Sequence, residues 1–102
     1  MSTSKTILVD IDGTICSEER TFEKSLAVPL PGAVERINQW HEQGHVIIFW
    51  TARGWEQYRM TKKWLDDNGF KYDQILMGKP QTTIFIDDRA RKFEGWDKDY
   101  LV

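Results

Sequence analysis

Two aspartates separated by a single residue follow a short apolar segment near the start of the chain, Ile7-Leu8-Val9-Asp10-Ile11-Asp12. Like charges at close range repel, and burial penalises each one, so the pair is costly unless a cation or a reaction uses it. One carboxylate can attack phosphorus, and its neighbour can exchange protons with the leaving alcohol and with water. Because residues two apart in an extended segment point the same way, Asp10 and Asp12 can face one phosphate while Ile11 faces the core.

Three further polar groups come directly after predicted strands. Thr51 follows the second strand, Lys79 follows the third, and Asp87 and Asp88 follow the fourth. Ligands bind at the carboxyl ends of the strands in open α/β sheets. We therefore expect these side chains to face one crevice together with the first aspartate pair.

A cluster of three or four carboxylates in that crevice needs a hard cation. A small number of oxygen ligands suits Mg²⁺, which keeps several waters and shares an oxygen of a bound phosphate. The Thr51 hydroxyl and the Lys79 ammonium would complete a pocket for a phosphoryl group. Arg53 follows Thr51 closely and is a further candidate for contact with the substrate phosphate.

The elements that must position these residues are predicted from the pattern of apolar residues and from Gly and Pro at their ends. The first strand is apolar throughout, which is typical of a parallel strand covered on both faces. Alternation of strands and helices predicts an α/β layer fold with a mostly parallel sheet. The predicted strands are 6–9, 45–50, 72–76 and 83–86, the predicted helices are 33–43 and 55–68, and a flap covers about 15–30.

At these residues the sequence resembles the haloacid-dehalogenase-like (HAD) phosphatase superfamily. The first motif of that superfamily is matched by Asp10-Ile11-Asp12-Gly13-Thr14, and the second, a Ser or Thr, is matched by Thr51. The third is matched by Lys79 in Gly78-Lys79-Pro80, and the acidic fourth by Asp87-Asp88. The resemblance covers residues 6–89, which is most of the chain.

The resemblance implies a three-layer, Rossmann-like fold with about four strands and no cap domain. It implies that Asp10 is the nucleophile and Asp12 the general acid and base. Thr51 and Lys79 would then hold the phosphoryl oxygens. The metal ligands would be Asp10, the Asp12 backbone carbonyl and Asp87, with Asp88 binding through water or orienting its neighbours.

Two features depart from the superfamily pattern. Only the flap is available where a cap could be inserted, so an open site is expected. Lys79 and Thr83 are four residues apart, whereas a parallel crossover normally needs a dozen or more. The fourth strand would then be reached by a direct loop or supplied by another chain, and this predicts a homo-oligomer with its contact near the strand ends.

Composition restricts the class of protein. The 102 residues suit one domain, 1–102, and a net charge of −2 gives no sign of a nucleic-acid or membrane partner. Cys16 is the only cysteine, which excludes an intrachain disulfide. No signal peptide or long apolar stretch is recognisable, and we expect a cytoplasmic protein.

The function that we expect is Mg²⁺-dependent hydrolysis of a phosphomonoester through an aspartyl-phosphate. A sugar phosphate of surface polysaccharide synthesis is the leading substrate, because the short third-to-fourth motif connection resembles small capsule-biosynthesis-type HAD phosphatases. Asp87-Asp88-Arg89 also resembles the phosphatase half of polynucleotide kinase/3′-phosphatases. A non-catalytic phosphoacceptor or phosphate-binding signalling domain is the alternative from another class.

Overall fold

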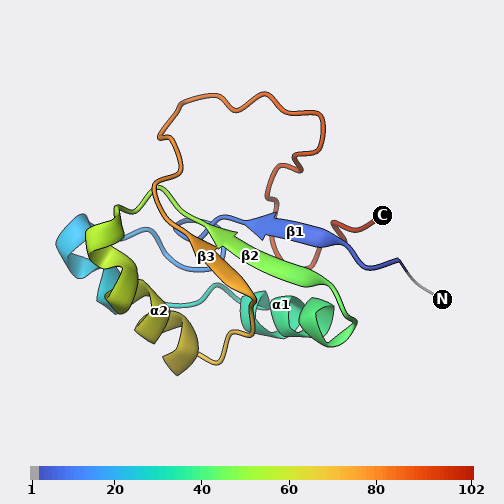
Figure 1. The fold of residues 1–102 in the computed structure, drawn as a ribbon, viewed down its shortest axis with the longest axis horizontal. Coiled ribbons are helices and arrows are strands. Elements are labelled where there is room, and N and C mark those ends of the chain that lie inside the picture. Colours follow the sequence, from blue (N-terminus) through green and yellow to red (C-terminus); the bar gives the residue numbers. More distant parts are fainter. Residues whose placement is uncertain (1–2) are drawn as a thin grey trace.

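A computed structural model describes residues 3–102, which form a parallel sheet of three strands with two α-helices (Figure 1). The strands are β1 (Thr6–Val9), β2 (Val46–Trp50) and β3 (Gln74–Leu76), and their order in the sheet is β1-β2-β3. Both strand pairs are parallel, with Thr6 opposite Val46 and Phe49 opposite Ile75. The carboxyl ends of all three strands therefore meet at one edge of the sheet, as the sequence predicts.

The two helices are amphipathic, and each buries one face. Helix α1 (Ala33–Glu42) buries Ala33, Ile37 and Trp40, and helix α2 (Tyr58–Asp67) buries Thr61, Trp64 and Leu65. Trp64 stacks on Phe70, whose ring meets the ring of Phe49 edge-on at 5.8 Å. Two short 3₁₀ helices, η1 (Thr21–Leu26) and η2 (Trp55–Gln57), complete the helical elements of the described residues.

The core lies on one face of the sheet. Ile47 and Phe49 of β2 are fully buried, while Ile48 and Trp50, which point to the opposite face, are only half-buried. Leu8 of β1 is 49% exposed. The prediction that the strands are covered on both faces is therefore wrong for the second face, because residues 3–102 supply α-helices to the core face alone and no helix follows β3. The α/β class and the parallel sheet are confirmed, and residues 3–102 form no cap domain.

The segment predicted as a fourth strand, 83–86, is not a strand in the structure. It belongs to a loop of residues 80–92 whose backbone arches out from the sheet (orange to red in Figure 1), while the Phe85 ring packs edge-on against Trp50 of β2 with centroids 6.0 Å apart. Every residue of this loop is exposed, and Ile84 and Ile86 are 73% and 93% exposed. We call residues 80–92 the arm. After it the chain returns to the body, where Trp96 packs edge-on against Trp40 with ring centroids 5.7 Å apart.

Candidate functional site

Asp10 and Asp12 follow β1 in a tight turn. Ile11 between them is fully buried, and its carbonyl accepts hydrogen bonds from the backbone N–H groups of Thr14 (3.1 Å) and Ile15 (2.9 Å). Gly13 has a φ of 79°, a left-handed conformation that glycine adopts without strain. Both carboxylates line the same cavity, so the predicted arrangement, with two aspartates facing out and Ile11 facing in, is what the structure has.

The cavity has a volume of about 950 Å³ and lies at the carboxyl ends of the strands. Its walls come from the β1, β2 and β3 loops, from the flap and from the start of the arm. Besides the aspartate pair, the charged and polar residues that line it include Thr21, Lys24, Arg53, Gln57, Lys79, Gln81, Thr82 and Thr83.

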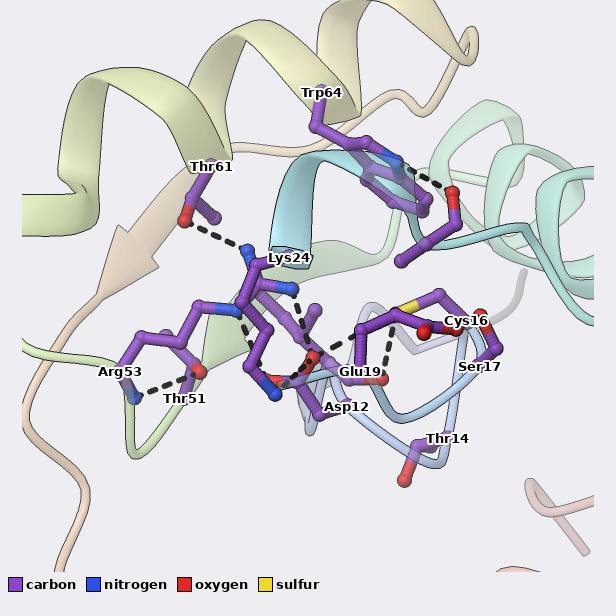
Figure 2. Close-up of polar contacts among 12 residues, drawn as sticks. Asp12, Thr14, Cys16, Ser17, Glu19, Lys24, Thr51, Arg53, Thr61 and Trp64 are labelled. Atoms are coloured by element: carbon purple, nitrogen blue, oxygen red, sulfur yellow. Dashed lines mark hydrogen bonds and ion pairs between the residues drawn. The ribbon is translucent and has the colours of Figure 1, made fainter. Parts of the chain in front are cut away.

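Asp12 is held by two cations. The Arg53 guanidinium donates from Nε to Asp12 Oδ2 (2.9 Å) and from Nη2 to Oδ1 (2.8 Å), and its Nη1 donates to Thr61 Oγ1 (2.9 Å) (Figure 2). Lys24 Nζ lies 3.2 Å from Asp12 Oδ1. Burial alone would raise the pKa of Asp12, but the hydrogen bonds and charge of Arg53 and the charge of Lys24 lower it. Asp12 is therefore a carboxylate at neutral pH.

Arg53 was predicted to contact the substrate phosphate, and the structure shows a different set of partners. The residue borders the cavity, but only 4% of it is exposed and its guanidinium is directed at Asp12 and Thr61. The planar guanidinium makes two hydrogen bonds to Asp12 and is itself held by the third, to Thr61. It therefore fixes one orientation of the Asp12 carboxylate. Arg53 therefore positions Asp12 in this structure.

Lys24 was missed by the sequence reasoning. It belongs to η1 in the flap, whose two sides are joined by the hydrogen bond from Ser17 N to Val28 O (2.9 Å). Trp64 Nε1 donates to the carbonyl of Ala27 (2.9 Å), which ties the flap to α2 (Figure 2). No local pattern in the flap marks Lys24, because its position follows from these contacts with distant parts of the chain.

Asp10 lies beside Lys79. The Asp10 Oδ1 to Lys79 Nζ distance is 3.8 Å, and Asp10 Oδ2 accepts a hydrogen bond from Thr14 Oγ1 at 3.2 Å. Burial raises the pKa of Asp10, and the charge of Lys79 and the Thr14 bond offset only part of that rise. The Lys79 ammonium also lies 5.2 Å from the ring centroid of Trp50. The Lys79 ammonium is thus placed to bind an anionic group that lies next to Asp10, at the carboxyl end of the sheet.

Thr51 lies beneath the cavity and is not one of its lining residues. It is 1% exposed, and its Oγ1 accepts a hydrogen bond from the backbone N–H of Arg53 at 3.1 Å. Its backbone carbonyl accepts from Lys79 N at 2.8 Å, so Thr51 fixes the loops that carry Arg53 and Lys79. Trp55, the first residue of η2, is 63% exposed, stacks on Tyr58 and does not line the cavity.

Asp87 and Asp88 do not lie in the cavity. Both are exposed on the arm, and Asp87 Oδ1 accepts a hydrogen bond from Arg89 N at 2.7 Å. Among residues 3–102 no three His, Cys, Asp or Glu side chains gather closely enough to hold a metal ion. The predicted convergence is therefore observed for Asp10, Asp12, Lys79 and Arg53, and it is not observed for the acidic pair of the arm.

Comparison with protein families gives one match that spans most of the chain. The family described as "PITM 1-3, LNS2 domain" matches residues 7–95. The chain belongs to this LNS2 domain family. The family is HAD-like, so the superfamily predicted from the four motifs is confirmed.

Solved structures share the fold of this chain. A crystal structure of a protein from Vibrio cholerae is 29% identical and has a TM-score of 0.74, covering 86% of this chain and 83% of that one. D,D-heptose 1,7-bisphosphate phosphatase from B. bronchiseptica, complexed with magnesium and phosphate, is 20% identical with a TM-score of 0.54, covering 72% of this chain and 49% of that one. The second likeness concerns the fold alone.

A curated relative matches over a shorter stretch. A Bacillus cereus protein that bears the name "Putative nucleotidase" is 48% identical over 42 residues, which are 41% of this chain. The match covers 22% of that protein's length. The chain thus spans about a fifth of the length of this curated relative, and the family assignment depends on the LNS2 match over residues 7–95. None of the helices formed by residues 3–102 has the length and apolar character needed to span a membrane.

Proposed function

We propose that this LNS2-family chain is a Mg²⁺-dependent phosphomonoester hydrolase that acts through an aspartyl-phosphate on Asp10. The observation that carries the proposal is the placement of Asp10 and Asp12 in one cavity of about 950 Å³, with Lys79 3.8 Å from Asp10. A carboxylate nucleophile, a second carboxylate two residues on and a cation for the phosphoryl group are the parts that this reaction needs.

The two carboxylates have different surroundings and take different roles. An Asp10 oxygen attacks phosphorus and the bond from phosphorus to the leaving oxygen breaks, while Asp12 gives that oxygen a proton. Water then attacks the phosphorus of the aspartyl-phosphate, Asp12 accepts its proton, and phosphate and Asp10 are released. Arg53 and Lys24 keep Asp12 ionised at rest, which suits the second step, and an anionic substrate beside Asp12 favours its protonation for the first.

The Asp10 carboxylate is a hard oxygen donor of the kind that a magnesium ion binds. The Asp12 carboxylate is bound by Arg53 and Lys24, which leaves the Asp12 backbone carbonyl and the Asp10 carboxylate as hard oxygen donors at the site. Asp87 would be a further direct ligand of the metal, and Asp88 would bind it through water, if the arm brought both residues to Asp10. Mg²⁺ would offset the repulsion between the Asp10 carboxylate and the substrate dianion.

A sugar phosphate is the substrate class that we propose. Hydroxyl and amide side chains line the cavity and can exchange hydrogen bonds with sugar hydroxyls; they are Thr21, Gln57, Gln81, Thr82 and Thr83.

Phosphate release from an aryl phosphate and from a panel of sugar phosphates and 3′-phosphorylated oligonucleotides tests the proposal. We expect release that a chelator stops and Mg²⁺ restores, and Asp10→Asn should lose several orders of magnitude because an amide does not attack phosphorus. The control is Asp67→Asn on the exposed surface of α2. Full activity of Asp10→Asn would refute the mechanism, and transfer of phosphate to Asp10 without release would indicate a phosphoacceptor domain instead.

A further inference from the structure

The ammonium group of Lys79 faces two aromatic rings. Its Nζ atom lies over the Trp50 ring, 5.2 Å from the centroid, and over the Phe85 ring, 5.7 Å from the centroid. The two rings meet edge-on with centroids 6.0 Å apart. Because the face of an aromatic ring carries partial negative charge, a cation within about 6 Å of the centroid is attracted to it.

Other contacts hold this ammonium only loosely. Its ion pair with Asp10 has an Nζ to Oδ1 distance of 3.8 Å, which is longer than a hydrogen bond. A lysine side chain has many rotamers, so keeping it in one of them costs conformational entropy. The backbone of Lys79 is fixed by the bond from its N–H to Thr51 O at 2.8 Å, but that bond does not restrict the end of the side chain. The two rings therefore supply the contacts that select one position of the ammonium beside Asp10.

The two rings belong to different parts of the chain. Trp50 is the last residue of β2, where it pairs with Leu76 of β3, and its side chain is half-buried. Phe85 belongs to the arm and is the one aromatic residue among residues 3–102 that lines the cavity. An apolar wall beside the ammonium excludes water, which strengthens the attraction between the ammonium and an anion. The contact of Phe85 with Trp50 and Lys79 thus joins the arm to the site.

We propose that Trp50 and Phe85 form an aromatic clamp that positions the Lys79 ammonium to bind a phosphoryl group next to Asp10. Neither ring takes part in the reaction, and both act through Lys79. A ring that only covered the sheet could be replaced by any apolar side chain of similar size, whereas a ring that holds a cation could not. The role in phosphoryl binding rests on the proposed function, but the positions of the ammonium and the two rings do not.

Nuclear magnetic resonance tests the clamp independently of activity. Ring currents move the Lys79 Hε resonance upfield when the end of the side chain lies over a ring face, and the resonance is assigned by its loss in Lys79→Met. We expect an upfield shift in the wild type, a smaller one in Phe85→Leu, and the full shift in Phe85→Tyr, which keeps the ring. The matched control is Phe22→Leu, which removes a 77% exposed ring on η1 and should leave the resonance unchanged. A wild-type Hε resonance at the position of an exposed lysine, or one that Phe85→Leu does not move, would overturn the proposal.

Steady-state kinetics test whether the clamp serves phosphoryl binding. Phe85→Leu should raise the KM for an aryl phosphate about two- to five-fold, the range of a cation–π contact at a partly exposed site, with kcat nearly unchanged, and Phe85→Tyr should restore the wild-type KM. Inorganic phosphate has no leaving group for Phe85 to touch, so its inhibition constant should rise by the same factor in Phe85→Leu. A KM that Phe85→Tyr does not restore, or an unchanged inhibition constant for phosphate, would refute a role through Lys79. If the wild-type chain releases no phosphate at all, the proposed function fails, and the Hε resonance still decides whether the clamp holds Lys79.

Discussion

Arg53 offers the sharpest test of how this site is held together. Its side chain makes three hydrogen bonds, two of them to the Asp12 carboxylate, and is 2% exposed. Arg53→Met keeps the apolar stem but removes all three donors and leaves Asp12, 15% exposed, with Lys24 as its cation. Removing one partner of a buried ion pair costs about 3–5 kcal/mol. Because Lys24 remains and Asp12 has some contact with water, we expect about 3 kcal/mol.

The assay is urea unfolding followed by tryptophan fluorescence, since the chain has five tryptophans. A loss of about 3 kcal/mol corresponds to a fall in Tm of about 12–24 °C for a domain of this size. The control is Lys63→Met, which breaks an exposed helical pair with Asp67 and should leave the unfolding free energy nearly unchanged. Asp12→Asn and the Arg53→Met, Asp12→Asn double variant complete a cycle in which the double variant should lose clearly less than the sum of the single losses. A loss below about 1 kcal/mol for Arg53→Met, or additive losses, would refute the reasoning.

The Arg53–Asp12 pair also determines the direction in which the free energy of unfolding changes with pH. The pKa of Asp12 is lower in the folded chain than its ordinary value, so folding is stabilised when Asp12 is ionised. This stabilisation is fully present above the unfolded pKa, about 3.9, and is lost as the pH falls through the folded value. The difference in unfolding free energy between the wild type and Asp12→Asn should therefore shrink under acid conditions, and a difference that grows there would contradict the assignment.

Three further predictions concern Lys24, Cys16 and the metal. Lys24→Gln should raise the KM for an aryl phosphate several-fold, because the Lys24 ammonium lies in the cavity 3.2 Å from Asp12. Lys62→Gln on the exposed surface of α2 should leave the KM unchanged, and equal KM values for the two variants would show that Lys24 does not act at the site. Cys16 is fully buried, and burial raises its pKa to about 12, so iodoacetamide at pH 8 should modify it only after unfolding in urea; rapid modification of the folded chain would contradict that burial. Asp87→Asn should raise the Mg²⁺ concentration needed for half-maximal activity, while Asp99→Asn on the exposed tail should not, and an unchanged requirement would exclude Asp87 as a ligand.

Much of the fold could be predicted from local patterns. Helices α1 and α2 follow from apolar residues at helical spacing, among them the buried residues Ile37, Trp40 and Trp64. The placement of Asp10 and Asp12 follows from the period of two in an extended segment, with Ile11 as the buried residue between them. In each case the pattern acts over a few residues, and no distant contact is needed to decide it.

The contacts that set the site could not be predicted in the same way. Arg53 has the charge and the place to bind phosphate, and only the fold shows that Asp12 and Thr61 take all three of its directed bonds. Lys24 reaches Asp12 because the flap is held against α2 by the bond from Trp64 to Ala27, which joins residues 37 positions apart. Such contacts depend on how distant segments pack, and the types of the residues alone do not determine them.

The arm shows the limit of a strand prediction. Residues 83–86 have strand composition, yet strand propensity measures how well side chains fit a paired, half-buried surface, so it is realised only when a partner edge is within reach. In this structure Phe85 packs edge-on against Trp50 of β2, with ring centroids 6.0 Å apart, but residues 83–86 pair with no strand, and Ile84 and Ile86 stay exposed. The composition of the segment alone therefore does not decide whether it forms a strand.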